Sequence, residues 1–200
     1  MASETSGAMT PDTLSASQRD RRSRMLTAAR QLAAKGGYDG VQMRDVADRA
    51  EVALGTLYRY FPSKVHLLVA VMNESAEGLA DRMERGAIPG DTAADRVIHV
   101  LGQAIRGLQR EPLLSEAMTR ALMFADTSAA TDVHSVTVHM TGMIIRAMRG
   151  PDREPSDDDE AIARVLEQVW LSTMTAWLAG RASASQLSED IEVAARLLLR

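Results

Sequence analysis

The sequence predicts an all-α protein of nine helices. Apolar residues recur at spacings of three and four along most of the 200-residue chain, whereas alternation of Val, Ile, Thr and Tyr over strand length is scarce. Glycine and proline punctuate these apolar stretches at intervals that suit helices of 8 to 26 residues. Because 46% of the residues are hydrophobic, the chain is able to bury a substantial core as one or two domains.

The first helix is expected to begin near Ser17. Ser17 and Asp20 have the spacing of a capping box, in which each residue satisfies an unpaired backbone N–H of the other. Gly36-Gly37 should end the helix, because glycine is favoured just beyond the last helical residue. Residues 1–16 are polar and are predicted to be a disordered arm without the basic start and apolar block of a signal peptide.

Two short helices are expected to follow, at 43–50 and 53–60, separated by a tight turn. Phe61-Pro62-Ser63 then breaks the chain and caps a long fourth helix. The remaining helices are separated by Pro89-Gly90, by Pro112 and by Gly150-Pro151. The expected ranges of these last six helices are 64–85, 92–110, 113–124, 130–148, 157–182 and 185–200.

The charge is distributed unevenly between the two parts of the chain. Residues 1–64 hold ten Lys/Arg and seven Asp/Glu, whereas residues 65–200 hold thirteen and twenty, and the formal net charge is −4. A basic N-terminal segment followed by an acidic remainder suggests a polyanion-binding domain joined to a second domain. We therefore expect a helix-turn-helix domain at 17–63 and a second domain at 64–200.

The stretch VALGTLYRYFPSK (52–64) has the composition of a binding surface whose backbone a partner molecule approaches closely. A glycine in the first turn of a helix costs about 1 kcal/mol relative to alanine, so Gly55 needs a reason beyond stability. Two short helices across a tight turn match a helix-turn-helix, whose last helix enters the DNA major groove. Thr56, Tyr58 and Arg59 would offer donors to phosphates or base edges. Leu57, Tyr60 and Phe61 are expected to pack inward.

The segment VQMRDVADRAEVALGTLYRYFPSKVHLL resembles the signature of TetR-family transcriptional regulators. The resemblance covers nearly the whole chain and implies a homodimeric repressor whose first three helices bind double-stranded DNA at an inverted-repeat operator. The rest of the chain would form a ligand pocket and the dimer interface. The sequence departs from the common family pattern at Glu51, where glycine is usual, and at Ala53 and Leu54, where a hydroxyl residue and a lysine are usual. A positive φ at position 51 would cost Glu about 1 kcal/mol.

The predicted DNA contacts combine the outward residues of 53–60 with two flanking cations. Lys64 would begin a helix, where the macrodipole disfavours a cation, and a phosphate partner would offset this. The predicted set is Arg44, Leu54, Gly55, Thr56, Tyr58, Arg59 and Lys64. Four arginines of the first helix, Arg19, Arg21, Arg22 and Arg24, are open to two interpretations: an ordinary solvated face, or contacts with the minor groove or the DNA backbone.

The second domain is rich in methionine and poor in aromatic residues. Eight of the twelve methionines lie between residues 72 and 174, and methionine suits a cavity that adapts to bulky aliphatic shapes, although any single one also suits an ordinary core. The predicted ligand pocket comprises Met72, Leu79, Leu101, Met118, Leu122, Met123, Phe124, Met140, Met143, Trp170, Met174 and Trp177. Trp170, Met174 and Trp177 form one helical stripe that suits either the pocket or a dimer seam.

The last two helices are predicted to form a four-helix dimer interface with those of a second subunit. Their apolar faces supply the expected interface residues, Ile162, Leu166, Val169, Ile191, Ala194, Ala195 and Leu198. A twofold dimer would place two recognition helices one DNA turn apart.

Several segments of the second domain, including VWLSTMTAWLAGRASA, are similar to TetR-family repressors of sterol catabolism. That resemblance implies an inducer that is a sterol-derived CoA thioester, with Arg106 or Arg120 as candidate contacts of the CoA. Regulators of efflux or of fatty-acid metabolism, and activators of the same fold, are the alternatives within the family.

A metal-dependent helical enzyme and a plain interaction module are the alternatives outside it. Asp157–Glu160 would supply the metal ligands of such an enzyme, although acids in a first helical turn also favour the helix dipole. The four histidines do not pair at helical spacing, and there is no cysteine. We expect no enzymatic activity, no metal, no cofactor and a cytoplasmic protein without a membrane span.

Overall fold

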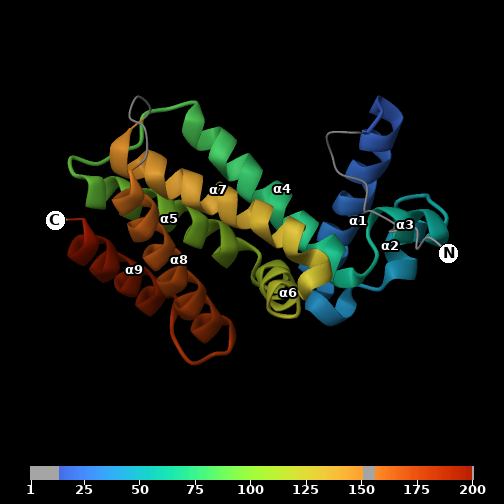
Figure 1. The fold of residues 1–200 in the computed structure, drawn as a ribbon. Coiled ribbons are helices and arrows are strands. Elements are labelled where there is room, and N and C mark those ends of the chain that lie inside the picture. Colours follow the sequence, from blue (N-terminus) through green and yellow to red (C-terminus); the bar gives the residue numbers. More distant parts are fainter. Residues whose placement is uncertain (1–13, 151–155, 200) are drawn as a thin grey trace. The chain divides into compact units, whose positions relative to one another are not determined.

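The computed structural model describes residues 14–150 and 156–199. Every regular element in these residues is a helix, which confirms the all-α prediction (Figure 1). The elements in chain order are α1 (Ala16–Gly40), α2 (Met43–Arg49), α3 (Leu54–Tyr60), α4 (Lys64–Glu84), α5 (Ala93–Arg110), α6 (Pro112–Met123), the short 3₁₀ helix η2 (Thr127–Ala129), α7 (Ala130–Arg149), α8 (Asp157–Leu178) and α9 (Ala184–Leu198).

The start of α1 differs from the sequence-based expectation. Ser15, not Ser17, is the N-cap: its hydroxyl accepts the N–H of Gln18, and the Gln18 side chain accepts the N–H of Ser15 at 2.7 Å. Ser17 lies inside the helix, so the predicted capping box of Ser17 and Asp20 is wrong. Leu14 is buried, and the part of the expected arm that precedes it, residues 1–13, lies outside the described residues.

Glycines with positive φ interrupt α1 and end α8. Gly37 has φ 61° and ψ −160°, which interrupts α1 where Gly36-Gly37 was expected to end it. The helix α8 ends at Leu178, four residues earlier than expected, because Gly180 has φ 67°. The N–H of Arg181 donates to the Ala176 carbonyl at 2.8 Å, which completes a Schellman motif.

The described chain forms two compact units. Unit 1 comprises the residues up to Met72 together with Leu113–Val133, and unit 2 comprises Asn73–Pro112 together with the chain from His134 onward. The first turns of α4 and nearly all of α6 therefore belong with α1–α3. The boundary that we expected between residues 63 and 64 does not coincide with the boundary between the units.

Unit 1 has a core made by α1–α3, the start of α4, and α6. α2 packs against both α1 and α3. The largest side chains that are completely buried in this unit are Met25, Leu26, Leu57, Leu67 and Leu68.

Unit 2 is centred on one continuous apolar cluster. α9 packs against α8 and α5 (Figure 1). The buried members of the cluster come from α5, α7, α8 and α9, and they are Val97, Val100, Leu101, Ile105, Met143, Ile144, Ala147, Met148, Ala163, Leu166, Trp170, Met174, Leu187, Ile191 and Ala195.

Candidate nucleic-acid interface

The turn between α2 and α3 is closed by a Schellman motif with Glu51 at the glycine position. The N–H of Val52 donates to the Ala47 carbonyl, and the N–H of Glu51 donates to the Asp48 carbonyl. Glu51 has φ 54°, and it is the one non-glycine residue with positive φ in the described part of the chain. The expected strain at position 51 is therefore present, at about 1 kcal/mol.

The inward faces of α2 and α3 are filled as the sequence predicted. Val46 and Ala47 of α2 are buried, and so are Leu57 and Tyr60 of α3 and Phe61 just after it. Because these five side chains fix α3 against the rest of unit 1, the opposite face of α3 is turned to solvent.

The outward face of α3 carries the residues expected to contact DNA. Gly55 and Arg59 are exposed, and 45% of Tyr58 is accessible, whereas Leu54 and Thr56 are half-buried. A Cβ on Gly55 would meet no atom within 4 Å, and its φ is not positive. Neither packing nor backbone conformation within the chain therefore requires glycine at this position.

Two predicted cations remain available beside this face. Arg44 at the start of α2 and Arg59 in α3 are exposed. Neither has a hydrogen-bond or ion-pair partner among the described residues. Both guanidinium groups are therefore able to pair with phosphates or with guanine edges.

The four arginines of α1 divide between internal and outward roles. Arg24 donates to the Ala50 carbonyl at the end of α2, Arg19 donates to the Leu14 carbonyl at 2.6 Å, and Arg22 lies over the Phe61 ring at 5.5 Å. No partner of Arg21 appears in the described part of the chain. Three of these arginines therefore support the local fold, a role that neither sequence interpretation anticipated.

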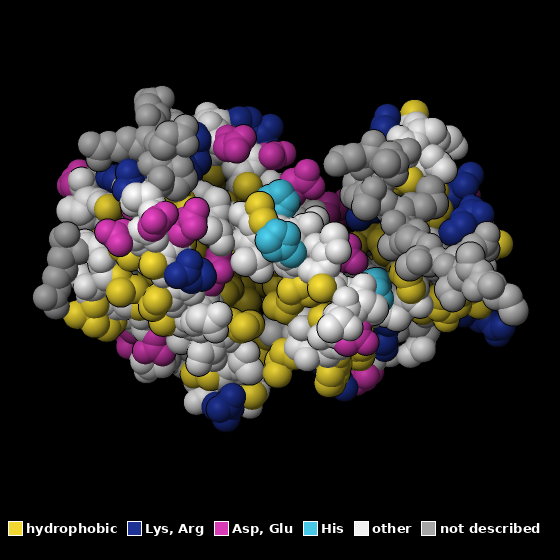
Figure 2. All heavy atoms as spheres, in the orientation of Figure 1, with side chains coloured by type: hydrophobic (Ala, Val, Ile, Leu, Met, Phe, Trp, Pro, Cys, Tyr) yellow, Lys and Arg dark blue, Asp and Glu magenta, His cyan; other side chains and the backbone are white. Residues whose placement is uncertain are grey.

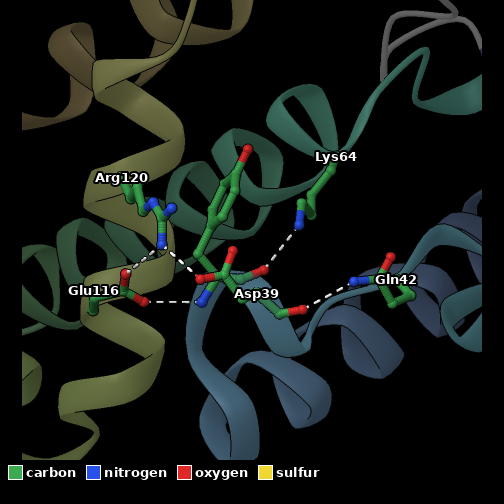
Figure 3. Close-up of polar contacts among 6 residues, drawn as sticks. Asp39, Gln42, Lys64, Glu116 and Arg120 are labelled. Carbon is green, nitrogen blue, oxygen red and sulfur yellow. Dashed lines mark hydrogen bonds and ion pairs between the residues drawn. The ribbon is translucent and has the colours of Figure 1, made fainter.

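Lys64 also has internal partners, which the sequence did not reveal. Its Nζ donates to the Tyr38 carbonyl at 3.0 Å and lies 4.1 Å from the centre of the Tyr38 ring (Figure 3). Partial burial lowers the pKa of this lysine, an effect that the nearby carboxylates of Asp39 and Glu116 oppose. The ammonium that we expected at a phosphate therefore contacts the end of α1.

The predicted pocket residues are divided between the two units. Met72, Met118, Leu122, Met123 and Phe124 belong to unit 1. Met123 and Phe124 are exposed, and the Phe124 ring packs edge-on against Tyr38, so neither of them lines an enclosed space. The other seven, Leu79, Leu101, Met140, Met143, Trp170, Met174 and Trp177, all belong to or pack against the apolar cluster of unit 2.

A pocket of about 230 Å³ lies at the edge of that cluster. Leu79, Met83, Ile88 and Val100 form its apolar part, and Arg82, His99 and Gln103 add polar groups. Sites for drug-sized ligands usually enclose about 300–1,000 Å³. A large ligand would therefore have to displace side chains of the cluster in order to enter unit 2.

The residues predicted for a dimer interface differ in how deeply they are buried within the subunit. Leu166, Ile191 and Ala195 are completely or almost completely buried in unit 2, and Ile162, Val169, Ala194 and Leu198 pack against its cluster. Three of the seven residues that we assigned to a partner subunit therefore belong to the core, and the four half-buried residues keep part of their surface exposed. The exposed hydrophobic residues of α8 and α9 are Val165, Leu171, Val193 and Leu197, and hydrophobic side chains are visible at the surface over α9 in Figure 2.

The acidic run at the start of α8 has a structural role. Asp159 accepts from the N–H and the hydroxyl of Ser156 in a capping box, and it pairs with Arg149. The pKa of Asp159 is lowered: partial burial, which raises it, is outweighed by the hydrogen bonds from Ser156 and the charge of Arg149.

No group of three or more metal-ligating side chains gathers in the described residues. None of the helices described is long and apolar enough to cross a membrane.

Two family models match the chain. Residues 25–71 match the model of bacterial regulatory proteins of the tetR family, and residues 90–198 match the tetracyclin repressor-like C-terminal domain. Among curated proteins, the chain is 51% identical over 185 residues to the HTH-type transcriptional repressor KstR of Mycolicibacterium smegmatis, covering 92% of this chain and 90% of that protein. It is 50% identical over 188 residues to KstR of Rhodococcus jostii, covering 94% and 87%.

Solved structures agree with this assignment. A TetR transcriptional regulator from Rhodococcus sp. RHA1 superposes with a TM-score of 0.84 at 39% identity, covering 92% of this chain and 97% of that one. Thermus thermophilus FadR in complex with lauroyl-CoA shares the fold, with a TM-score of 0.71 at 23% identity and coverage of 89% and 93%. These relatives are regulators, which confirms the prediction that the chain is not an enzyme. The chain belongs to the TetR family of bacterial transcriptional regulators.

Proposed function

We propose that the protein is a ligand-released transcriptional repressor that binds an inverted-repeat operator as a homodimer and controls sterol or related lipid catabolism. Each subunit inserts α3 into the major groove. Binding of a sterol-derived CoA thioester to unit 2 favours a state with lower operator affinity.

The observation that carries the proposal is the outward face of α3. Gly55 lies in open space with ordinary helical backbone, so its lack of a side chain has no use inside the chain. A duplex that approaches the helix closely makes use of it. Tyr58 and Arg59 flank this opening and supply a hydroxyl and a guanidinium for phosphates or base edges.

The proposed dimer uses the outer faces of α8 and α9. Their inner faces are buried in the apolar cluster. Apolar surface is exposed on their outer faces at Val165, Leu171, Val193 and Leu197. Pairing of these two helices with those of a second subunit would bury that surface in a four-helix arrangement. The twofold axis then relates the two copies of α3.

The proposed inducer site is the apolar cluster of unit 2. Met83, Met140, Met143, Met148 and Met174 belong to it or border it, and methionine side chains repack around large apolar bodies at low cost. The KstR relatives are repressors, and the FadR structures of Thermus thermophilus and Bacillus subtilis hold lauroyl-CoA and stearoyl-CoA. Arg106 is exposed beside Gly102 and is a candidate for the CoA phosphates, whereas Arg120 is already paired with Asp39.

The experiment that tests the DNA-binding part begins with selection of duplexes from a random pool by the wild-type protein. The selected sites should be inverted repeats with half-sites about one helical turn apart. Arg59→Met should weaken binding by about 1–3 kcal/mol and lower the salt slope of the affinity by about one. Selection of no common site, or of sites without twofold symmetry, would reject the proposal.

A regulator that responds to fatty acyl-CoA is the second candidate, favoured by the ligands of the two FadR structures. The selected duplex is titrated in the presence of a sterol acyl-CoA thioester, stearoyl-CoA or free CoA. Release by the sterol thioester alone supports the first candidate, and release by stearoyl-CoA alone supports the second. Transcription from a reporter that carries the operator separates a repressor from an activator.

A further inference from the structure

Tyr38 lies at the centre of a polar cluster that joins three helices of unit 1. Its N–H donates to Glu116 Oε2 of α6 at 2.9 Å, and its carbonyl accepts from Lys64 Nζ of α4 at 3.0 Å. Its ring faces Lys64 Nζ at 4.1 Å and Arg120 at 4.8 Å, and it meets the Phe124 ring edge-on. We call Tyr38, Lys64, Glu116 and Arg120 the Tyr38 clamp (Figure 3).

Gly37 in α1 leaves room for the Glu116 carboxylate of the clamp. Gly37 has φ 61°, and a Cβ at this position would lie 2.8 Å from Glu116 Oε2. The carboxylate therefore occupies the space that any other residue would need for its side chain. Arg120 Nη1 contacts the same carboxylate at 3.5 Å and Asp39 Oδ2 at 2.9 Å, so α6 binds two consecutive residues of α1, Tyr38 and Asp39.

The clamp brackets the helix-turn-helix along the chain. α2 begins five residues after Tyr38, and α3 ends four residues before Lys64. The bond between Lys64 and the Tyr38 carbonyl thus joins the two ends of the DNA-binding segment, and Glu116 and Arg120 fix that junction to α6. Displacement of α3 by even a fraction of a turn would misplace several DNA contacts together, because they all sit on one short helix.

We infer that Lys64, Glu116 and Arg120 are positioning residues for DNA binding, which act through Tyr38 and not through contact with DNA. The inference rests on the proposed DNA-binding function. It assigns to Lys64 a role different from the phosphate contact that its place in the sequence suggests, because both its hydrogen bond and its ring contact are made within the protein.

The test compares the salt dependence of operator affinity among matched variants, on a duplex selected by the wild-type protein. Each lost phosphate contact lowers the slope of log affinity against log salt by about 0.9, whereas a lost positioning contact leaves the slope unchanged. Lys64→Met should weaken binding about tenfold with the wild-type slope. Arg59→Met should lower the slope by about one. Lys35→Met, which removes an exposed lysine of α1, should stay within twofold of wild type.

A double-mutant cycle and a conservative variant complete the test. Lys64→Met and Glu116→Ala should be markedly non-additive, because both act on Tyr38. Tyr38→Leu should weaken binding, and Tyr38→Phe should restore it, because the clamp uses the ring and the backbone but not the hydroxyl. A lower salt slope for Lys64→Met, or additive losses in the cycle, would overturn the inference.

A measurement without DNA separates this inference from the proposed function. Amide hydrogen exchange of Tyr38 and of residues 43–60 should accelerate in Glu116→Ala and in the milder Glu116→Gln, while exchange in α8 stays unchanged. If wild type selects no duplex, the proposed function fails by itself. Unchanged exchange at Tyr38 in both variants would overturn the clamp whether or not the protein binds DNA.

Discussion

Unit 1 and unit 2 are both helical, but they bury different kinds of side chain. Three of the four buried polar side chains in the described residues, His66, Ser115 and Thr119, lie in unit 1. His66 links Ser63 at the start of α4 to the Ser128 carbonyl in η2, and Tyr38 is held by three charged residues. Hydrogen bonds and cation–ring contacts have narrow geometry, so they fix one arrangement of the helices.

Unit 2 is held together mainly by its apolar cluster, which is rich in methionine. Its ion pairs and caps lie near helix ends, such as Arg96 on the carbonyls of Ala147 and Met148. Dispersion and hydrophobic contacts are weakly directional, so such a core is able to repack. The difference fits the proposal that unit 1 presents α3 in one position and that unit 2 repacks its interior around a ligand.

The largest expected effect tests whether apolar packing dominates unit 2. Leu166→Ala removes a completely buried side chain and should lower the free energy of unfolding by about 2–5 kcal/mol. Leu113→Ala is the matched control, because Leu113 of α6 is a leucine with 47% exposure outside the proposed dimer surface, and it should cost much less. Urea denaturation at one protein concentration measures both. Equal costs would mean that burial in the apolar cluster does not set the cost of truncation.

The next prediction concerns the outer face of α9. Val193→Asp places a charge where the proposed dimer excludes water, which should raise the dimer dissociation constant by at least about tenfold. Ser188→Asp adds the same charge elsewhere on α9 and should leave the constant nearly unchanged. Sedimentation equilibrium measures both variants. A dimer that survives Val193→Asp unchanged would remove α9 from the interface.

A pair of glycines in unit 1 should respond in opposite directions. Gly37→Ala strains a positive φ and pushes against Glu116, so it should destabilise the protein by about 1–2 kcal/mol. Gly55→Ala should stabilise it by up to about 1 kcal/mol, because alanine favours the helix and its Cβ lies in open space. Thermal unfolding measures both effects.

Operator affinity then separates the effect of Gly55 on DNA binding from its effect on stability. Gly55→Ala should bind DNA more weakly despite its greater stability, because the added methyl lies on the face that meets the duplex. Full affinity in Gly55→Ala would show that DNA does not approach α3 at this residue.

The smallest effect concerns Glu167 of α8, a half-buried carboxylate that accepts a hydrogen bond from Thr141. Burial raises the pKa of Glu167 above its ordinary value of 4.5. The folded state therefore binds the proton more tightly than the unfolded state. The associated stability is fully present below the unfolded pKa and is lost as the pH rises through the folded pKa.

Glu167→Gln should accordingly raise the free energy of unfolding at pH 7, on the order of 0.5 kcal/mol because solvent screens a half-exposed group. The gain should vanish near pH 4, where the carboxyl is protonated in both states. A stability profile from pH 4 to 8 measures this. In unit 1, burial also raises the pKa of Asp132, so Asp132→Asn should show the same sign. A loss of stability in Glu167→Gln at pH 7 would contradict the direction of the shift.

Much of the fold was accessible from local sequence signals. The bounds of α2 and α3 were predicted to within a residue at each end, because apolar spacing and the Pro62-Ser63 break act over a few residues. The family resemblance drew attention to Glu51 as a residue that a positive φ would strain, and its φ is positive. Where a local competitor was overlooked, the prediction was wrong: Ser15 outcompeted Ser17 as a cap, and Gly180 ended α8 early.

Periodicity alone could not distinguish the core residues of α8 and α9 from those available to a partner. An apolar stripe shows that a helix buries one side, but it does not say whether a core or a partner covers that side. In unit 2, Leu166, Ile191 and Ala195 are buried in the apolar cluster. Exposed residues such as Val193 remain available to a partner.

The sequence by itself determined that the chain is helical, where its helix-turn-helix lies, and which side chains of α3 face outward, since each of these depends on residues close together in the chain. Only the tertiary structure decided that Lys64, Glu116 and Arg120 meet at Tyr38. Tyr38 is 26 residues from Lys64 and 78 residues from Glu116 along the chain, and nothing in either local pattern indicates that they meet. A contact between distant segments is set by how helices pack, which is a property of the whole core.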